Sequence, residues 1–230
     1  MKFLAIDTST EACSVALWLD GEIRERFEIA PRRHTELVLP WADELLADAN
    51  IAKSQLDAIA VARGPGAFTG VRLAVALAQG MALALDIPVV PVSTLAALAL
   101  QASSPAMVLT AIDARMGEIY FGVFRRTEAG VQAIGEEWIA TADDPRLPIT
   151  GDWVGLGTGF AAAEGRLINT LRSSLKFSDP AALPHAADVA RLAALAFARG
   201  ESVAADHVEP AYLRDKVALT LAEQQKARGG

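Results

Sequence analysis

Residues 63–72, RGPGAFTGVR, form a glycine-rich stretch of a kind that can bind a ligand. A glycine-rich turn that opens a helix commonly binds phosphate, because its backbone N–H groups point at the anion. No lysine follows the last glycine here, and the spacing of Gly64, Gly66 and Gly70 is one residue too wide for the dinucleotide fingerprint. Pro65 also removes one amide donor. We therefore expect this turn to shape the backbone ahead of a helix and not to hold a phosphate.

Two aspartates, Asp7 and Asp113, each end a strand-like segment and precede a turn. Carboxylates in such places can hold a metal ion or orient a phosphate. Two of them facing each other across a cleft would suit an ATPase or kinase of the actin-like class. Aspartate is equally good at capping a turn, and the turns TSTE and ARMG are poor in glycine, which leaves few amides free to reach a phosphate. Capping is favoured, and the two aspartates remain the nucleotide-binding candidates.

The remaining reactive side chains do not assemble into a catalytic or metal-binding pattern. The histidines, His34, His185 and His207, are not spaced three or four residues apart, as a helical zinc pair would be. The single cysteine, Cys13, lies in an apolar run and cannot form an internal disulfide. No catalytic residue, metal or cofactor is expected.

The elements that would position these residues form an internal repeat. AIDTSTEACSVALW, residues 5–18, aligns without a gap with AIDARMGEIYFGVF, residues 111–124. Residues on one face of a period-2 strand coincide, with Cys13, Val15 and Leu17 falling on Ile119, Phe121 and Val123. Helical segments follow the strands, so the repeat predicts an α/β fold of two lobes built on one design.

The stretch QASSP predicts the boundary between the lobes. The first lobe is expected to cover residues 1–105 and the second residues 106–230. Roughly the last 20 residues are expected either to return toward the first lobe or to fray.

The helix after the glycine turn is apolar on nearly all sides, whereas a surface helix should have a polar side. Gly70, Ala74, Ala78 and Ala82 recur every four residues, and small residues permit another helix to approach closely. We therefore expect a partner subunit to complete a helix bundle here. The predicted partner surface is His34, Leu37, Val38, Trp41 and Leu45 in the preceding helix, with Arg72, Val75, Ala78, Gln79 and Leu83.

Composition limits the possible classes of protein. The 230 residues are 52% apolar and 21% charged, which is typical of a globular protein. The net charge of −7 argues against independent binding to nucleic acid, where phosphate neutralisation requires basic residues. No signal peptide is recognised, and the longest apolar run falls short of the roughly 20 residues that a membrane span needs. A cytoplasmic protein without a membrane partner is expected.

Six motifs together resemble the TsaB (YeaZ) family of bacterial proteins. They are IDTSTEACSVAL, HTELVLP, GPGAFTGVRLAVALAQGMALAL, PVVPVSTLAALA, AIDARMGEIYFGVF and EPAYLRD, in order along the chain. The resemblance implies a two-lobed actin-like ATPase (ASKHA) fold. It also implies a role in placing the threonylcarbamoyl group on the adenosine next to the anticodon of tRNA.

The resemblance further implies a non-catalytic dimerisation subunit. In that family the transfer is carried out by the paralogous, metal-binding subunit TsaD. The ATPase TsaE docks on the TsaB–TsaD pair, and tRNA is reached only through the complex. The metal-binding HxxxH pair of TsaD falls on Thr94 and Leu98 here, and neither can replace an imidazole.

Three alternatives stay open at this point. The lone chain could form a homodimer through the same apolar helices. An actin-like ATPase or kinase using Asp7 and Asp113 is the second hypothesis for the function. A peptidase is the third, and it rests only on the old glycoprotease label of the superfamily.

Overall fold

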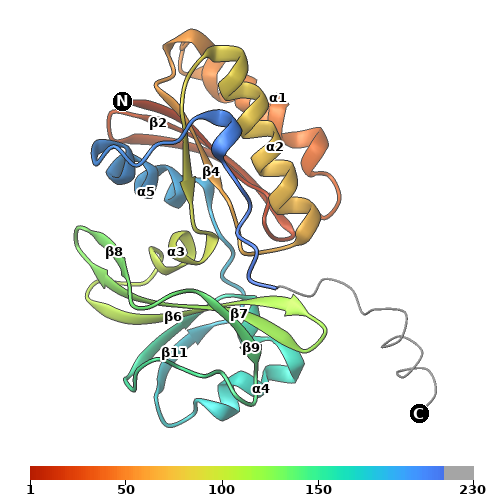
Figure 1. Ribbon diagram of the computed structural model, residues 1–230, viewed down its shortest axis with the longest axis vertical. Coiled ribbons are helices and arrows are strands. Elements are labelled where there is room, and N and C mark those ends of the chain that lie inside the picture. Colours follow the sequence, from red (N-terminus) through yellow and green to blue (C-terminus); the bar gives the residue numbers. More distant parts are fainter. Residues whose placement is uncertain (215–230) are drawn as a thin grey trace, which may run out of the picture.

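Two β-sheets of the same topology form the framework of the protein (Figure 1). The computed structural model describes residues 1–214. The first sheet has the order β3-β2-β1-β4-β5, with β1 Lys2–Asp7, β2 Ala12–Leu19, β3 Glu22–Ile29, β4 Ala58–Ala62 and β5 Val89–Val92. The second has the order β11-β10-β6-β7-β8, with β6 Ala106–Arg115, β7 Glu118–Thr127, β8 Gly130–Ala133, β10 Trp153–Leu156 and β11 Leu175–Asp179; β9, Trp138–Thr141, pairs with β7.

Helices cover both sheets. The α-helices are α1 His34–Asp48, α2 Phe68–Leu85, α3 Thr94–Ala99, α4 Ala162–Thr170 and α5 Ala186–Ala198. Three short 3₁₀ turns are η1 Lys53–Gln55, η2 Thr158–Phe160 and η3 Ala205–His207.

The predicted repeat is confirmed as a duplicated sheet. β1 pairs antiparallel with β2 and parallel with β4, and β6 pairs antiparallel with β7 and parallel with β10. The apolar faces predicted to coincide do so: Cys13, Val15 and Leu17 lie in one core cluster, and Ile119, Phe121 and Val123 lie in its counterpart. The predicted α/β class with two actin-like lobes is therefore confirmed.

Alternate residues of the first strand contribute to the core on opposite faces of the first sheet. Leu4 and Ile6 of β1 pack on the side covered by α1 and α2, while Phe3 and Ala5 pack on the side covered by α5. Because successive strand residues point to opposite faces, a strand covered on both sides must be apolar throughout. This explains the continuous apolar run at the start of the chain.

Helix α2 is long and apolar enough, by length and composition, to cross a membrane. In this protein Ala74, Ala78 and Ala82 are fully buried and belong to the core cluster shared with β1, β2 and β4. The small residues therefore bring α2 close to its own sheet. A core helix packed on one side passes the same length and composition test, so this property does not indicate a span.

The chain returns to the first lobe after the second sheet, so the two lobes do not divide it into residues 1–105 and 106–230. Helix α5 packs on β1, β2, β4 and β5. Residues 203–214, here called the strap, then run along α2 (Figure 1). Val203 pairs with Val89, the Gln79 Nε2 donates to the Val208 carbonyl oxygen at 3.2 Å, and the Ala211 N–H donates to the Arg63 carbonyl at 2.7 Å. The expectation for roughly the last 20 residues stays a prediction, because residues 215–230 lie outside the described part.

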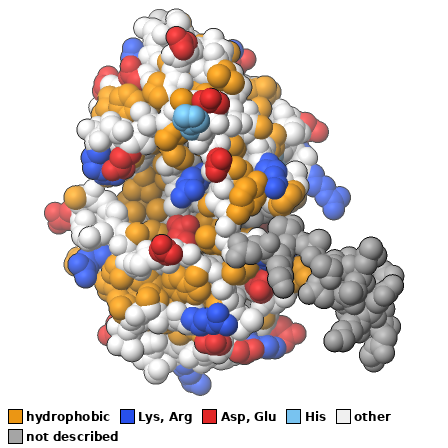
Figure 2. Space-filling model, viewed as in Figure 1, with side chains coloured by type: hydrophobic (Ala, Val, Ile, Leu, Met, Phe, Trp, Pro, Cys, Tyr) orange, Lys and Arg blue, Asp and Glu red, His pale blue; other side chains and the backbone are white. Residues whose placement is uncertain are grey.

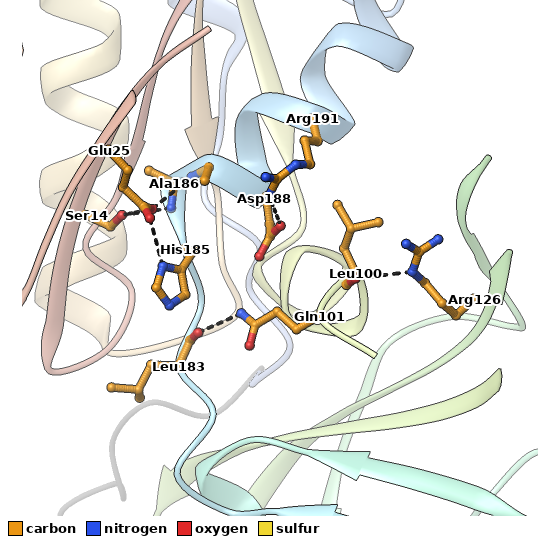
Figure 3. A network of polar contacts seen from close by, with 11 residues as sticks. Ser14, Glu25, Leu100, Gln101, Arg126, Leu183, His185, Ala186, Asp188 and Arg191 are labelled. Carbon is orange, nitrogen blue, oxygen red and sulfur yellow. Dashed lines mark hydrogen bonds and ion pairs between the residues drawn. The ribbon is translucent and has the colours of Figure 1, made fainter. Parts of the chain in front are cut away.

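The two crossings between the lobes are tied by side chains (Figure 3). Gln101 on the first crossing donates from Nε2 to the Leu183 carbonyl oxygen on the second, at 2.8 Å. Beyond Leu183 the chain enters α5, where the Ala186 N–H donates to the Ser14 Oγ at 2.9 Å and the Ala187 N–H donates to the Glu25 Oε1 at 3.0 Å. The first lobe thus holds the start of α5 through strands β2 and β3.

Candidate functional site

A cleft of about 780 Å³ lies between the lobes. It is lined by the β1–β2 turn, the start of α2, the β6–β7 hairpin, η2 and the strap. In an actin-like ATPase or kinase this is where opposed carboxylates would act, so the cleft tests the two aspartate candidates and the glycine turn together.

The glycine turn is filled by the chain's own backbone. A Cβ on Gly66 would lie 2.4 Å from the Ser9 carbonyl oxygen, and one on Gly70 would lie 1.9 Å from the Thr8 carbonyl oxygen. The Ala67 N–H donates to the Ser9 carbonyl at 2.7 Å, and the Thr8 Oγ1 donates to the Gly70 carbonyl at 2.7 Å. Glycine is required here because the β1–β2 turn packs directly on the start of α2. One amide that a phosphate could use, that of Ala67, is thereby already bonded.

Asp7 is buried beneath that turn and does not line the cleft. Its Oδ1 accepts hydrogen bonds from the Ser9 N–H at 2.8 Å and from the Ser9 Oγ at 2.6 Å, which is a turn-capping arrangement. Oδ2 has no hydrogen-bond partner among residues 1–214. Burial raises the pKa of Asp7 to about 6, with the hydrogen bonds from Ser9 opposing that rise.

Asp113 does line the cleft, but it also caps its own turn. Its Oδ1 accepts from the Arg115 N–H at 2.8 Å, and its Oδ2 accepts from the Arg115 Nη1 at 3.0 Å. Within residues 1–214 no three His, Cys, Asp or Glu side chains gather as metal ligands would. The two aspartates therefore occupy equivalent places in the repeat, yet only one of them faces the cleft.

Half of the predicted partner surface is corrected by the structure. Val38, Leu45, Val75 and Ala78 are at most 4% exposed and pack inside the first lobe's own core. His34 is also engaged, since its Nε2 lies 3.1 Å from the Thr10 carbonyl oxygen and 3.2 Å from that of Ala12. The spacing identified apolar positions correctly. It could not distinguish the side of α2 that packs on the sheet from the side that faces outward.

The outward side of the two helices keeps a smaller apolar surface. Leu83 of α2 is 66% exposed and Leu39 of α1 is 45% exposed. Half-buried Leu37 and Trp41 of α1 pack against the core of the first lobe. Hydrophobic side chains reach the surface of the upper lobe between charged ones in Figure 2. We call Leu37, Leu39, Trp41 and Leu83 the outer helix face.

Sequence reasoning missed the polar network that surrounds His185. The His185 Nδ1 lies 3.0 Å from the Glu25 Oε2, and the His185 ring stacks on Phe27 with centroids 4.2 Å apart. The hydrogen bond to Glu25 raises the pKa of His185. Burial alone would raise the pKa of Glu25, but hydrogen bonds from His185, Ala187 and Ser14 bring it below its ordinary value. No sequence signal links a strand residue to a histidine so far along the chain.

Comparison with known proteins shows which family shares this sequence and architecture. The chain is 42% identical over 229 residues to the tRNA threonylcarbamoyladenosine biosynthesis protein TsaB of Escherichia coli, covering 95% of this chain and 96% of that protein. It is 39% identical to the TsaB protein of Haemophilus influenzae, covering 94% and 95%. The chain belongs to the TsaB family. Residues 27–221 also match the family model of TsaD, described as tRNA N6-adenosine threonylcarbamoyltransferase.

Solved structures agree with this membership of the TsaB family. YeaZ from Pseudomonas aeruginosa superposes with a TM-score of 0.83 at 42% identity, covering 92% of this chain and 99% of that one. A Pseudomonas aeruginosa protein described as similar to the peptidase YeaZ gives a TM-score of 0.86 at 42% identity, covering 93% and 99%.

Thr94 and Leu98, on which the sequence resemblance places the TsaD histidine pair, are core residues in this chain. Thr94 and Leu98 of α3 are both fully buried. The Leu98 Cδ2 packs so closely on Gly157 that a Cβ there would lie 2.6 Å away. Neither side chain is a ligand for a transition metal.

Proposed function

We propose that this chain is a non-catalytic dimerisation and scaffold subunit in the synthesis of threonylcarbamoyladenosine on tRNA. It pairs with a TsaD-type transferase subunit through α1 and α2 and helps to recruit a TsaE-type ATPase to that pair. It works in the cytoplasm and reaches tRNA only through the complex. The names of its relatives support the pathway, and the buried Thr94 and Leu98 support the lack of a metal centre.

The exposed apolar side chains of the outer helix face support the proposed pairing with a TsaD-type subunit. A leucine that is 66% exposed on an otherwise apolar helix is an unfavourable surface feature, and burial against a partner would remove it from water.

The proposal is tested by sedimentation of the purified chain, alone and mixed with the TsaD-type subunit of the same organism. A one-to-one complex is expected, and Leu83→Lys should abolish it. The matched control is Leu195→Lys on α5, which replaces a leucine 43% exposed on the opposite side of the same sheet and should leave pairing intact. The proposal is contradicted if the unmodified chain does not bind the transferase subunit, or if the Leu83→Lys variant binds it equally well. A shift of the chain alone to twice its mass would instead reveal a homodimer.

One observation favours the alternative function, an actin-like ATPase or kinase. The Asp7 Oδ2 is buried and has no hydrogen-bond partner among residues 1–214, as a carboxylate awaiting a ligand would be. Turnover of ATP by the chain alone, lost in Asp7→Ala, would support that function. The filled glycine turn leads us to expect no turnover.

A further inference from the structure

Arg72, in the first turns of α2, is held in an unusual environment at the cleft. Its guanidinium carbon lies 3.3 Å from the centroid of the Phe68 ring and 5.1 Å from that of Tyr212 in the strap. Arginine binds aromatic faces through its delocalised charge, and two rings fix its orientation. Phe68 and Tyr212 are 55% and 56% exposed, so the rings that fix Arg72 also form the rim of the cleft.

The charge of Arg72 has no acid to balance it in the described part of the chain. Two other cleft arginines are paired, Arg115 with Asp113 and Arg214 with Glu118. No carboxylate of residues 1–214 lies within 4.0 Å of Arg72, and its Nη1 is buried with no hydrogen-bond partner there. A buried donor without an acceptor is costly, which favours a ligand that supplies one.

We propose that Arg72 is the anchor for a carboxylate of the partner subunit, an aspartate or glutamate side chain that enters the mouth of the cleft beside Phe68 and Tyr212. This inference rests on the proposed pairing with a TsaD-type subunit. A planar guanidinium suits the two oxygens of a carboxylate. The exposed rings would cover the apolar stem of that side chain.

A phosphate fits the same place less well. The Ala67 amide nearby is already bonded to Ser9, and Glu11 and Asp113 also line the cleft and would repel a doubly charged group. The net charge of −7 opposes a polyanion such as tRNA. A single carboxylate on a protein surface carries less charge, so Glu11 and Asp113 repel it less, and it can use the spare Arg72 donor without any backbone amide.

The test measures the affinity of the full chain for the TsaD-type subunit by biolayer interferometry at two salt concentrations. Arg72→Ala should weaken binding on the order of 10- to 100-fold, because it removes one partner of a charge-assisted pair. Arg72→Lys should recover only part of that loss, since lysine lacks the planar fork. Arg172→Ala, at an exposed arginine of the second lobe, makes the same change in net charge and should bind as the unmodified chain does.

Two further readouts separate anchoring from a structural role. The melting temperature of Arg72→Ala should stay near that of the unmodified chain, and the variant's binding should depend less on salt. Arg72→Glu should regain affinity for one transferase variant in which a surface acid is replaced by arginine, and that acid is then the partner of Arg72.

The outcomes distinguish this inference from the proposed function. If Leu83→Lys abolishes binding but Arg72→Ala binds within about twofold of the unmodified chain, the anchor is wrong and the scaffold function stands. If the unmodified chain does not bind the transferase subunit, both fail. If Arg72→Ala binds that subunit normally but the complex loses tRNA, the ligand is a phosphate and the carboxylate proposal is overturned.

Discussion

Gly70 lies in the first turn of α2, against the carbonyl oxygen of Thr8, and Gly80 lies later in the same helix with open space around it. Gly70→Ala should destabilise the protein by about 3 kcal/mol, because its methyl group would meet a backbone oxygen at 1.9 Å and force the turn away. Gly80→Ala should instead stabilise it by about 0.5–1 kcal/mol, because alanine is the better helix former. Urea unfolding of the two variants measures both effects, and equal changes would mean that the turn does not pack on the helix.

Asp7 gives a residue-scale prediction about pH. Its pKa is raised by burial from 3.8 to about 6, so the folded state favours the protonated form more than the unfolded state does. A raised carboxyl pKa leaves stability highest below about pH 4 and lowers it as the pH rises through about 6, by on the order of 3 kcal/mol in total. Asp7→Asn cannot ionise and should lack this loss.

The check is urea unfolding of both proteins at pH 4 and pH 7. The unmodified chain should lose more stability than the variant over this interval. Parallel pH profiles would show that Asp7 stays accessible to water or has a partner that balances its charge.

At the scale of elements, α2 has two apolar sides with opposite roles. Ala78 faces the sheet and is fully buried, whereas Leu83 faces outward. Ala78→Trp should therefore unfold or strongly destabilise the first lobe, by about 3 kcal/mol, because overpacking displaces the sheet. Leu83→Lys should change the free energy of unfolding little, since surface substitutions lie within about 0.5 kcal/mol. Thermal unfolding of both variants tests the orientation of the helix. An Ala78→Trp variant as stable as the unmodified chain would show that Ala78 does not face the sheet.

Sequence patterns predicted which strands and helices form better than they predicted which of these elements pack against each other. The gapless repeat of residues 5–18 and 111–124 predicted the duplicated hairpins, because period-2 alternation is local. The return of α5 to the first sheet had no such signal, since a helix with an apolar face can cover either sheet. The same limit explains Val75 and Ala78: helical spacing groups residues on faces, but only the packed lobe shows which face lies inside.

Helix α5 also depends on a charged pair from another element. Glu25 accepts from His185 and from the Ala187 N–H at the start of the helix. Glu25→Gln should cost about 2 kcal/mol and increase hydrogen exchange at the start of α5, because a hydrogen bond to a charged group is lost. Glu28→Gln, exposed on the same strand, is the control.

The pH dependence of this pair has two limits. The lowered pKa of Glu25 contributes stability that is present above its ordinary 4.5 and is lost as the pH falls through the lowered value. The raised pKa of His185 contributes stability that is present below its ordinary 6.5 and is lost as the pH rises through the raised value. The cost of Glu25→Gln should thus be largest between pH 4.5 and 6.5. A cost that is equal at pH 5.5 and pH 9 would show that the pair is not charged.

At the scale of the whole molecule, the strap connects the two lobes outside the two crossings. One end is held by Arg63 and Gln79 of the first lobe. At the other end the Arg214 Nη2 donates to the Ala114 carbonyl oxygen at 3.1 Å and pairs with Glu118 of the β6–β7 hairpin. The strap spans the cleft as a tie between its walls.

Arg214→Ala should therefore loosen the lobes without unfolding them. The side chains of Arg214 and Glu118 are 22% and 39% exposed, so the pair should contribute no more than about 1 kcal/mol to overall stability. The expected effect is local, with faster hydrogen exchange in the β6–β7 hairpin and in the strap. Arg166→Ala breaks an exposed pair with Asp143 inside the second lobe and should leave both segments unchanged. If Arg214→Ala exchanges as slowly as this control, the two crossings alone fix the lobes and the strap is only a cover for α2.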